Sequence, residues 1–232
     1  MKVDTLKKIL FLRERNNSFV LVRNLNLQKD LFYIPDEESN SEYLEPEIKN
    51  KCIEALDKDK SILINYKDSE LFLNVFNPRL KLVIIGAVHI ANSLIKIASI
   101  LGYDIVLIDP RESFLNSQEF NKITKISKWP DEALKSISID SRTAIVTLSH
   151  DPKLDEPALI ESLKSKAFYI GALGSKKTHE KRVKRLTNIG LCKDSIKKIN
   201  APVGLPLGAI STEEIAISII AQMTDHLRNK KN

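Results

Sequence analysis

The densest group of residues able to bind a ligand lies between Ile170 and His179, which reads Ile-Gly-Ala-Leu-Gly-Ser-Lys-Lys-Thr-His. Backbone N–H groups at the start of a helix bind anions, and glycines allow close approach to them. Because a helical pattern follows, the segment predicts a phosphate-type anion site, with a simple strand-to-helix turn as the alternative. Its spacing does not match a P-loop. The expected binding residues are Gly171, Gly174, Ser175, Lys176 and Lys177.

A second glycine turn, Gly86-Ala-Val-His-Ile-Ala, follows an apolar run and opens a helical pattern, as a dinucleotide fingerprint does. Its second glycine position holds Val88, whose branched side chain obstructs the approach of a pyrophosphate. Asp109 ends the next apolar run at a spacing that suits a carboxylate bonding a ribose, and Arg111 can meet a phosphate. We expect an empty or reused nucleotide site, with NAD(P) as the less favoured ligand. The candidate residues are Gly86, Val88, His89, Asp109 and Arg111.

A third polar turn, Leu148-Ser-His-Asp-Pro, also follows an apolar run. His150 can act as an acid, a base or a ligand near neutral pH, and Asp151 can join it or simply cap a turn. The two interpretations are equally favoured. His89, His150 and His179 show no metal-ligand spacing, so no metal site is predicted, and no catalytic residue is assigned.

The fourth segment, Ala201-Pro-Val-Gly-Leu-Pro-Leu-Gly-Ala-Ile, exposes backbone through Gly204 and Gly208. The Ser-Thr-Glu-Glu that follows it predicts a capping box, with Ser211 as the N-cap and Glu214 at the third helical position. The alternative is that Glu213 or its neighbour faces a ligand pocket instead of the cap.

The elements that must position these turns alternate between strand and helix patterns after Pro78. Continuous apolar runs at 80–85, 105–108, 144–148 and 167–170 predict strands buried on both faces. Helical spacing over 90–101, 130–137, 157–164, 178–188 and 213–227 predicts helices between or after them. The alternation predicts an α/β fold, a doubly wound, Rossmann-like parallel sheet over residues 79–232, with ligands at the carboxyl ends of the strands.

Residues 1–78 predict a small N-terminal α+β domain. Helical spacing covers 4–15 and 45–57, whereas 18–25, 30–34, 61–66 and 70–76 are strand candidates, the last two forming a hairpin. Asn77-Pro78 then marks the predicted domain boundary. An exposed face of this sheet would allow two copies to pair, so a homodimer is plausible.

The composition excludes several protein classes. The 232 residues are 43% hydrophobic and 28% charged, which excludes a disordered chain, and the net charge is +6. Two distant cysteines exclude a disulfide scaffold and suit the cytoplasm. No apolar run is long enough to span a membrane, and the N-terminus lacks signal-peptide features. The basic segment 176–198 contains no aromatic residue, which argues against nucleic-acid binding.

Taken in order, the motifs resemble the Rossmann domain of the XdhC/CoxI family over about residues 80–226. These motifs are Ile85-Gly-Ala-Val-His-Ile-Ala, Leu107-Ile-Asp-Pro-Arg, Thr147-Leu-Ser-His-Asp-Pro-Lys-Leu-Asp, Tyr169-Ile-Gly-Ala-Leu-Gly-Ser-Lys-Lys, Ala201-Pro-Val-Gly-Leu-Pro-Leu-Gly-Ala and Thr212-Glu-Glu-Ile-Ala-Ile-Ser-Ile. The family comprises maturation factors for molybdenum hydroxylases, such as xanthine dehydrogenase and carbon monoxide dehydrogenase.

The resemblance implies a carrier rather than an enzyme with turnover. Family members bind molybdenum cofactor (molybdopterin) transiently, protect it while a cysteine desulfurase or sulfurtransferase exchanges an oxygen ligand for sulfur, and deliver it to the apo-hydroxylase. The phosphate of the cofactor suits the segment Gly171–Lys177. The resemblance therefore implies two partners, the hydroxylase and the sulfurtransferase, and a cytoplasmic location.

Residues 1–78 depart from the family, because they lack its Gly-Ser-Ser-Pro-Arg and Gly-Cys-Val-Glu segments. The N-terminal domain is thus interpreted as a degenerate form, and a partner protein would supply what it lacks. Two alternatives remain open: an NAD(P)-dependent oxidoreductase on the same fold, and a non-catalytic protein that bridges hydroxylase and sulfurtransferase without holding the cofactor.

Overall fold

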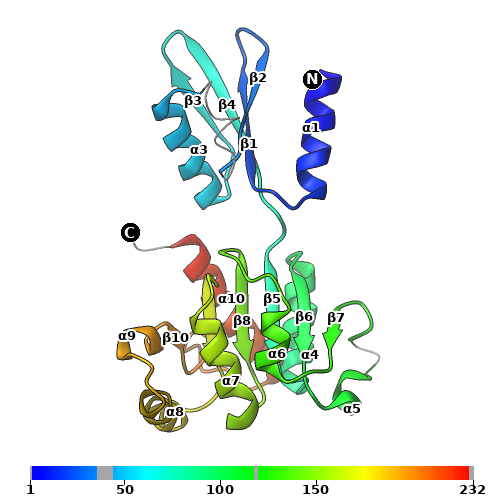
Figure 1. Cartoon of the computed structure of the whole chain (residues 1–232), viewed down its shortest axis with the longest axis vertical. Helices are drawn as coiled ribbons and strands as arrows, with labels where there is room; N and C mark the ends of the chain where they lie inside the picture. The colour runs from blue at the N-terminus through cyan, green and yellow to red at the C-terminus, as the bar shows by residue number, and fades with distance from the viewer. Residues whose placement is uncertain (1, 36–43, 118–119, 230–232) are drawn as a thin grey trace. The chain divides into compact units, whose positions relative to one another are not determined.

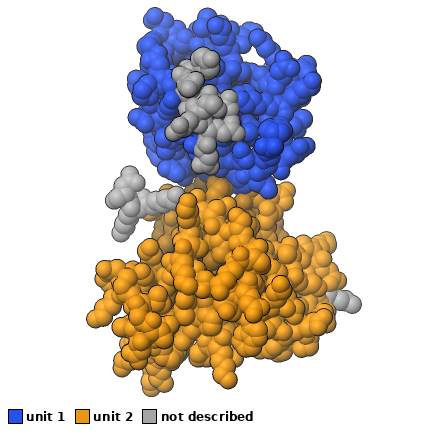
Figure 2. All heavy atoms as spheres, in the orientation of Figure 1, with its two compact units in different colours: residues 1–78 blue, residues 79–232 orange. Residues whose placement is uncertain are grey.

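The computed structural model describes residues 2–35, 44–117 and 120–229. The chain forms two compact units, Met1–Pro78 and Arg79–Asn232, which are coloured separately in Figure 2. Each unit has its own sheet, and the two are described in turn.

The N-terminal unit is an antiparallel sheet with helices on both faces. Strands β1 (Phe19–Asn24), β2 (Lys29–Tyr33), β3 (Ile62–Tyr66) and β4 (Ser69–Phe76) lie in the order β2-β1-β4-β3. Helix α3 (Pro46–Lys58) packs on the face that carries Val20 and Val22. Helix α1 (Val3–Glu14) packs on Phe19 and Leu21, which point to the opposite face because side chains alternate along a strand.

The C-terminal unit is built on a six-stranded parallel sheet (Figure 1). Its strands are β5 (Lys81–Ile85), β6 (Asp104–Ile108), β7 (Thr124–Ile126), β8 (Thr143–Thr147), β9 (Tyr169–Ala172) and β10 (Ile199–Asn200). They lie in the order β10-β9-β8-β5-β6-β7. The chain runs outward from β5 in one direction and then from β8 in the other, so the switch point lies between these two central strands. The predicted doubly wound α/β fold is confirmed.

Helices cover both faces of this sheet. Helices α4 (His89–Ile100) and α10 (Thr212–Arg228) share one core with β5 and β8. Helices α6 (Pro130–Lys135), α7 (Pro152–Leu163) and α8 (Lys176–Asn188) pack on the other face, and α5 (Glu112–Leu115) and α9 (Lys193–Ile196) are single turns. The central strands are buried on both sides, as their unbroken apolar runs require.

The structure differs from the sequence-based expectation mainly at α7, which begins at Pro152 and not at Pro157. Asp151 is its N-cap, with Oδ1 accepting the Lys153 N–H at 2.9 Å, and Pro152 takes the first helical position, where its missing N–H costs nothing. Pro157 lies inside the helix. The short β7, β10, α5 and α9 carry too few residues for a periodic pattern to reveal them.

Candidate functional site

Four of the turns singled out from the sequence follow the strands β5, β6, β8 and β9, and these four strands run parallel. Their carboxyl ends therefore meet at one edge of the sheet, across the switch point. This strand-end edge is the candidate site. Its turns differ in how many of their polar groups already hydrogen-bond to one another.

The turn after β6 is closed by its own hydrogen bonds. The Asp109 carboxylate is fully buried and accepts from the Ala87 N–H at 2.8 Å and from Arg111 Nε and Nη2 at 2.8 and 2.7 Å. It also accepts from the Arg111 N–H at 3.0 Å, and the Arg111 guanidinium lies 4.1 Å from the centre of the Phe114 ring. Both predicted ligand residues are thus bonded to each other, and neither Asp109 oxygen is free to bond a ribose.

The same bonds decide the charge of Asp109. Burial by itself would raise the pKa of this carboxyl, but hydrogen bonds from Arg111 and from the Ala87 N–H outweigh it, and the pKa is lowered. An ionised, satisfied carboxylate that ties β6 to the turn after β5 is a structural link.

The turn after β5 is packed tightly against the turn after β8. Gly86 has φ +103°, and a Cβ at this position would lie 2.9 Å from the Ser149 Cα and N atoms. Only glycine fits this conformation and this contact. Val88 is the half-buried N-cap of α4 without a side-chain cap bond, and His89 begins the helix with an exposed ring. This turn joins neighbouring strand ends and does not present a glycine-lined cradle.

The turn after β8 carries the two predicted residues in different roles. Asp151 caps α7, as one of the two interpretations of the sequence proposed. His150 is exposed and has φ +61°, a left-handed conformation that few residues other than glycine adopt. His150 is thus an exposed residue of the turn that follows β8.

The turn after β9 carries the residues for which the sequence predicts an anion site. Gly174 has φ +134°, and Ser175 is the N-cap of α8, its Oγ accepting the Thr178 N–H at 3.2 Å. Lys176 and Lys177 are exposed in the first turn of the helix. Helical N–H groups and two ammonium groups thus face solvent at the positive end of the α8 dipole.

Arg182 underlies this turn and was missed from the sequence. Its side chain is only 4% exposed, and Nη2 donates to the Leu173 O at 2.9 Å. The same atom is 3.8 Å from where a Cβ of Gly174 would lie. Burial is the main cause that lowers the pKa of this guanidinium. Arg182 places a positive charge directly beneath the glycine turn.

Asp155 faces Arg182 and was missed as well. Its carboxylate is 1% exposed; Oδ1 accepts from Ser149 Oγ at 2.6 Å, and Oδ2 lies 3.9 Å from Arg182 Nη2. That separation is too long for a hydrogen bond. Among the described residues, Asp155 Oδ2 and Arg182 Nη1 are buried without a hydrogen-bond partner. Asp155 stands among the buried apolar residues of α7, which is a sequence signal for it. The strongly charged helix α8 gives no such signal for Arg182.

Gly171 and Gly204 serve packing below the edge. A Cβ at Gly171 would lie 2.6 Å from Val203 Cγ2, and one at Gly204 would lie 2.3 Å from Ser218 Oγ. The Gly204 N–H and the Tyr169 hydroxyl both donate to Gln222 Oε1, at 2.9 and 2.6 Å. Gly171 thus lets β9 approach Val203, and Gly204 lets the 201–210 segment approach Ser218 of α10.

The carboxylates at the start of α10 already accept hydrogen bonds from within the protein. The predicted capping box of Ser211 and Glu214 is confirmed. Glu213 accepts from Ser93 Oγ at 3.0 Å and so joins α10 to α4. Gly208 lies in an exposed part of the preceding segment, and a Cβ there would meet nothing within 4 Å. Of this segment, the exposed stretch around Gly208 remains accessible to a ligand or partner.

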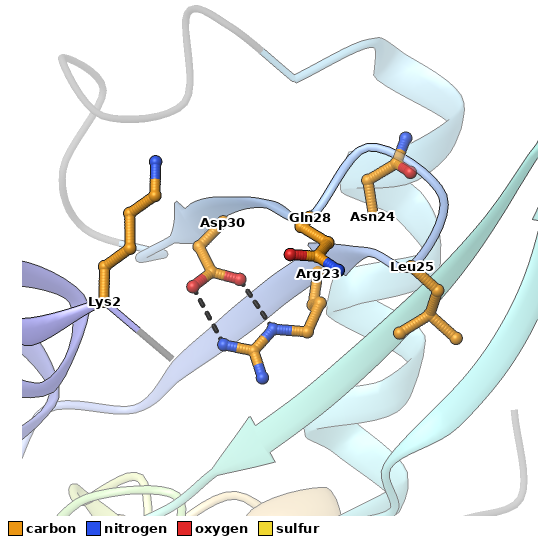
Figure 3. A pocket seen from close by; sticks show the side chains of 6 residues that line it. All are labelled: Lys2, Arg23, Asn24, Leu25, Gln28 and Asp30. Atoms are coloured by element: carbon orange, nitrogen blue, oxygen red, sulfur yellow. Dashed lines mark hydrogen bonds and ion pairs between the residues drawn. The ribbon is translucent and has the colours of Figure 1, made fainter.

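A polar hollow of about 470 Å³ lies in the N-terminal unit (Figure 3). Arg23 Nε and Nη2 donate to the two Asp30 oxygens at 2.7 and 2.8 Å, and the hydrogen bond from Arg23 is the main cause that lowers the pKa of Asp30. This pair neutralises itself across the β1–β2 hairpin, and we interpret it as a stabiliser of the hairpin. The lining residues are Lys2, Arg23, Asn24, Leu25, Gln28 and Asp30.

Metal and thiol chemistry find little support in the described residues. No three His, Cys, Asp or Glu side chains among them come together as metal ligands. Cys52 lies on the buried face of α3, and burial raises the pKa of its thiol to about 12. Cys192 is exposed at the start of α9, where hydrogen bonds from Ser195 lower its pKa. In the part of the chain that the structure describes, no helix has the length and apolar character needed to cross a membrane.

The match to a family model shows to which protein family this chain belongs. Residues 82–223, which contain every turn described above, match the model of the XdhC Rossmann domain. The chain belongs to the XdhC Rossmann domain family. The matched stretch is most of the C-terminal unit, from β5 into α10.

Three relatives each match about two thirds of the chain. A molybdenum cofactor insertion chaperone, PaoD of Escherichia coli, is 30% identical over 64% of this chain and 40% of its own length. A Bacillus subtilis protein, named as a probable xanthine dehydrogenase subunit, is 28% identical over 67% of this chain and 45% of its own. The E. coli protein YqeB is 28% identical over 66% and 28%, respectively. The chain thus matches less than half the length of each relative.

One solved structure resembles the chain over nearly its whole length. The crystal structure of a xanthine dehydrogenase from Bacillus halodurans superposes with a TM-score of 0.69, covering 99% of this chain and 65% of that one, at 24% identity. At this identity the likeness supports the fold, including an α+β unit before the Rossmann unit.

Proposed function

We propose that this XdhC family member is a maturation factor that holds molybdenum cofactor by its phosphate at the turn Leu173–Lys177 and passes it to an apo-hydroxylase. Family membership and the likeness to a molybdenum cofactor insertion chaperone support this proposal. The sulfurtransferase that exchanges the oxygen ligand, the hydroxylase, a homodimer and a cytoplasmic location belong to the same proposal.

The observation that carries the proposal is the positive turn after β9. Arg182 lies beneath Gly174 with Nη1 unpaired, and Lys176 and Lys177 stand above it beside the N-terminus of α8. These groups are all donors, which is the chemistry that a phosphate requires. The residues present therefore fit the phosphate of the cofactor.

The other turns supply the surroundings of the bound molecule. His150 and the stretch around Gly208 are exposed near the carboxyl ends of the strands and would contact the pterin or shield it from water. The sulfur exchange would occur on the metal centre that the cofactor itself supplies. This chain contributes binding and orientation, and no residue of its own is assigned a bond-making step.

The NAD(P) alternative loses its support in the turn after β6. A ribose would need Asp109, whose oxygens already accept four hydrogen bonds from Ala87 and Arg111. Binding a nucleotide there would require breaking a buried ion pair.

The proposal is tested by purifying the protein without oxygen from cells that make molybdenum cofactor. We expect a pterin that oxidises to a fluorescent product, identified by mass spectrometry after denaturation. Failure to recover a pterin, and failure to bind one offered in vitro, would leave the bridging protein without cofactor as the better description.

The phosphate site is tested by the double variant Lys176→Ala/Lys177→Ala. Losing one charge-assisted contact costs about 1.4 kcal/mol or more, so cofactor affinity should fall about tenfold or further. Lys193→Ala/Lys198→Ala removes two exposed lysines of the neighbouring α9 region and should leave affinity unchanged. Equal losses in both doubles would mean that only the general positive charge matters.

A further inference from the structure

We propose that Asp155 and Arg182 are positioning residues that couple the turn after β8 to the turn after β9, so that the two move as one body at the strand-end edge. The existence of this link does not depend on the ligand. Its role in cofactor binding rests on the proposed function.

The first step of the link runs from Asp155 to the turn after β8. Asp155 Oδ1 accepts from Ser149 Oγ at 2.6 Å and from the Ser149 N–H at 3.3 Å. The residue lies in the first turn of α7, whereas Ser149 lies ahead of the helix. One buried carboxylate thus holds the backbone that leads to His150.

The second step runs from Arg182 to the turn after β9. Arg182 Nη2 donates to the Leu173 O at 2.9 Å and lies beneath Gly174. Because Leu173 directly precedes the glycine, its carbonyl direction helps to set the backbone that faces the anion. Arg182 therefore supports the phosphate turn from within the protein.

The third step joins the two residues across the interior. Asp155 Oδ2 and Arg182 Nη2 are 3.9 Å apart, and their side chains are 1% and 4% exposed. Opposite charges interact more strongly away from water, so a shift of either side chain changes the field at the other. Displacing the Ser149 turn therefore affects Arg182 and, through it, the Leu173 carbonyl.

Ser149 extends the link to the turn after β5. The Gly86 backbone packs so closely on Ser149 that an added Cβ would lie 2.9 Å from its backbone. Three neighbouring strand-end turns are consequently connected through one serine and one buried ion pair. Two apolar side chains could fill the same volume without linking these backbones, because they would not hydrogen-bond to them.

The chain contains a matched pair that makes no such link. Arg185 and Glu156 also join α8 to α7, with Nη2 and Oε1 2.5 Å apart, and the Arg185 side chain is 43% exposed. Each of its members neighbours the buried pair along its helix. It therefore serves as an internal control for the effect of joining the same two helices.

The experiment measures amide hydrogen exchange of the whole ligand-free chain. In Asp155→Asn, exchange in the Leu173–Thr178 peptide should quicken about tenfold, although Asp155 does not hydrogen-bond to that turn. In Arg182→Met, exchange in the Ser149–Asp151 peptide should quicken likewise. Exchange in β5 should remain unchanged, which shows that the whole fold has not simply become less stable.

The controls separate coupling from ordinary damage. Glu156→Gln and Arg185→Met should change exchange in either turn by less than about twofold. Arg182→Lys keeps a charge and one donor, and should restore part of the protection lost in Arg182→Met. Ser149→Ala removes the hydroxyl that donates to Asp155. If Asp155→Asn fails to fold, exchange in the Leu173–Thr178 peptide is measured in Ser149→Ala instead.

Faster exchange confined to the turn that each variant touches, with the remote turn unchanged, would overturn the proposal. Faster exchange throughout the fold, including β5, would also overturn it. Pterin affinity of Asp155→Asn is measured separately, and we expect it to fall about tenfold. If remote exchange changes but the wild-type chain binds no pterin, the link stands and the proposed function fails.

Discussion

Two aspartate–arginine pairs at the same edge of the sheet have opposite characters. Asp109 and Arg111 are bonded through two short contacts of 2.8 and 2.7 Å, and burial of the carboxylate is outweighed by its donors, so its pKa is lowered. Asp155 and Arg182 are 3.9 Å apart, and burial dominates, so the pKa of Asp155 is raised.

The two pairs therefore differ in whether their hydrogen-bonding groups are all satisfied. The first pair satisfies both carboxylate oxygens and closes the turn where a ribose would bind. The second pair leaves Asp155 Oδ2 and Arg182 Nη1 without hydrogen-bond partners among the described residues, directly below the positive turn. Charged atoms are costly to bury unpaired, so their presence there is better explained by a role at the site than by stability.

The largest effect is expected from Asp109→Asn. An amide has one oxygen where the carboxylate offers two, and its NH2 group would face donors from Ala87 and Arg111. We expect the free energy of unfolding in urea to fall by about 3 kcal/mol.

Asp104→Asn, at the start of the same strand, is the control for that variant. Asp104 contacts Arg79 at 3.8 Å with its side chain 61% exposed, so the loss should stay below about 0.5 kcal/mol. Similar losses in the two variants would show that Asp109 is not a structural link.

A smaller effect is expected from Gly86→Ala. Its φ of +103° and the 2.9 Å approach to Ser149 both oppose a side chain, and we expect a loss of about 2 kcal/mol. Gly102→Ala, at φ +78° with nothing within 4 Å of the added carbon, should cost only about 1 kcal/mol. Urea unfolding measures the free energy of unfolding of both variants. Equal losses would mean that Ser149 moves aside to make room for the added methyl group.

The two aspartates should have opposite effects on the pH dependence of stability. The lowered pKa of Asp109 gives stability that is present above its ordinary value of 3.8 and is lost as the pH falls further. The raised pKa of Asp155 makes the free energy of unfolding decline as the pH rises from 3.8 through its folded pKa.

Asp155→Asn removes that decline. Relative to the wild type, the unfolding free energy of the variant should rise as the pH increases above 3.8, by at most about 1.4 kcal/mol per pH unit. Urea titrations at several pH values measure it. Parallel curves for the two proteins would show that Asp155 titrates normally in the fold.

The smallest effect is expected from Glu156→Gln, which breaks the exposed pair with Arg185. Solvent screens this pair, so the free energy of unfolding should change by less than about 0.5 kcal/mol. A loss above about 1 kcal/mol, measured in urea, would mean that exposure is a poor guide to the two α7–α8 pairs.

Much of the fold could be predicted because its signals are local. The apolar runs at 80–85 and 105–108 became β5 and β6, and the capping box at Ser211 marked the start of α10. Pro157 is typical of a helix start and predicts one there, whereas α7 begins five residues earlier, because Asp151 supplies an N-cap and Pro152 fits the first helical position. The N-capping interaction at Asp151 stabilises the longer helix although Pro157 then lies inside it.

The site could be predicted only in part. The glycine turn before α8 is visible as a cluster of donors in a short segment. The sequence does not reveal that Asp109 is already saturated, because its donors come from two turns. Nor does it reveal that Asp155 and Arg182 face each other, because each is one of several charged residues on its helix and the partner lies on the other helix.

The sequence by itself determined the alternation of strands and helices, and with it the edge at which polar turns collect, since periodicity and capping act between near neighbours. Only the tertiary structure decided which polar groups at that edge are hydrogen-bonded to one another and which still have a donor or acceptor without a partner. That distinction depends on distances of a few ångströms between segments far apart in the chain, where burial removes the water that would otherwise satisfy them.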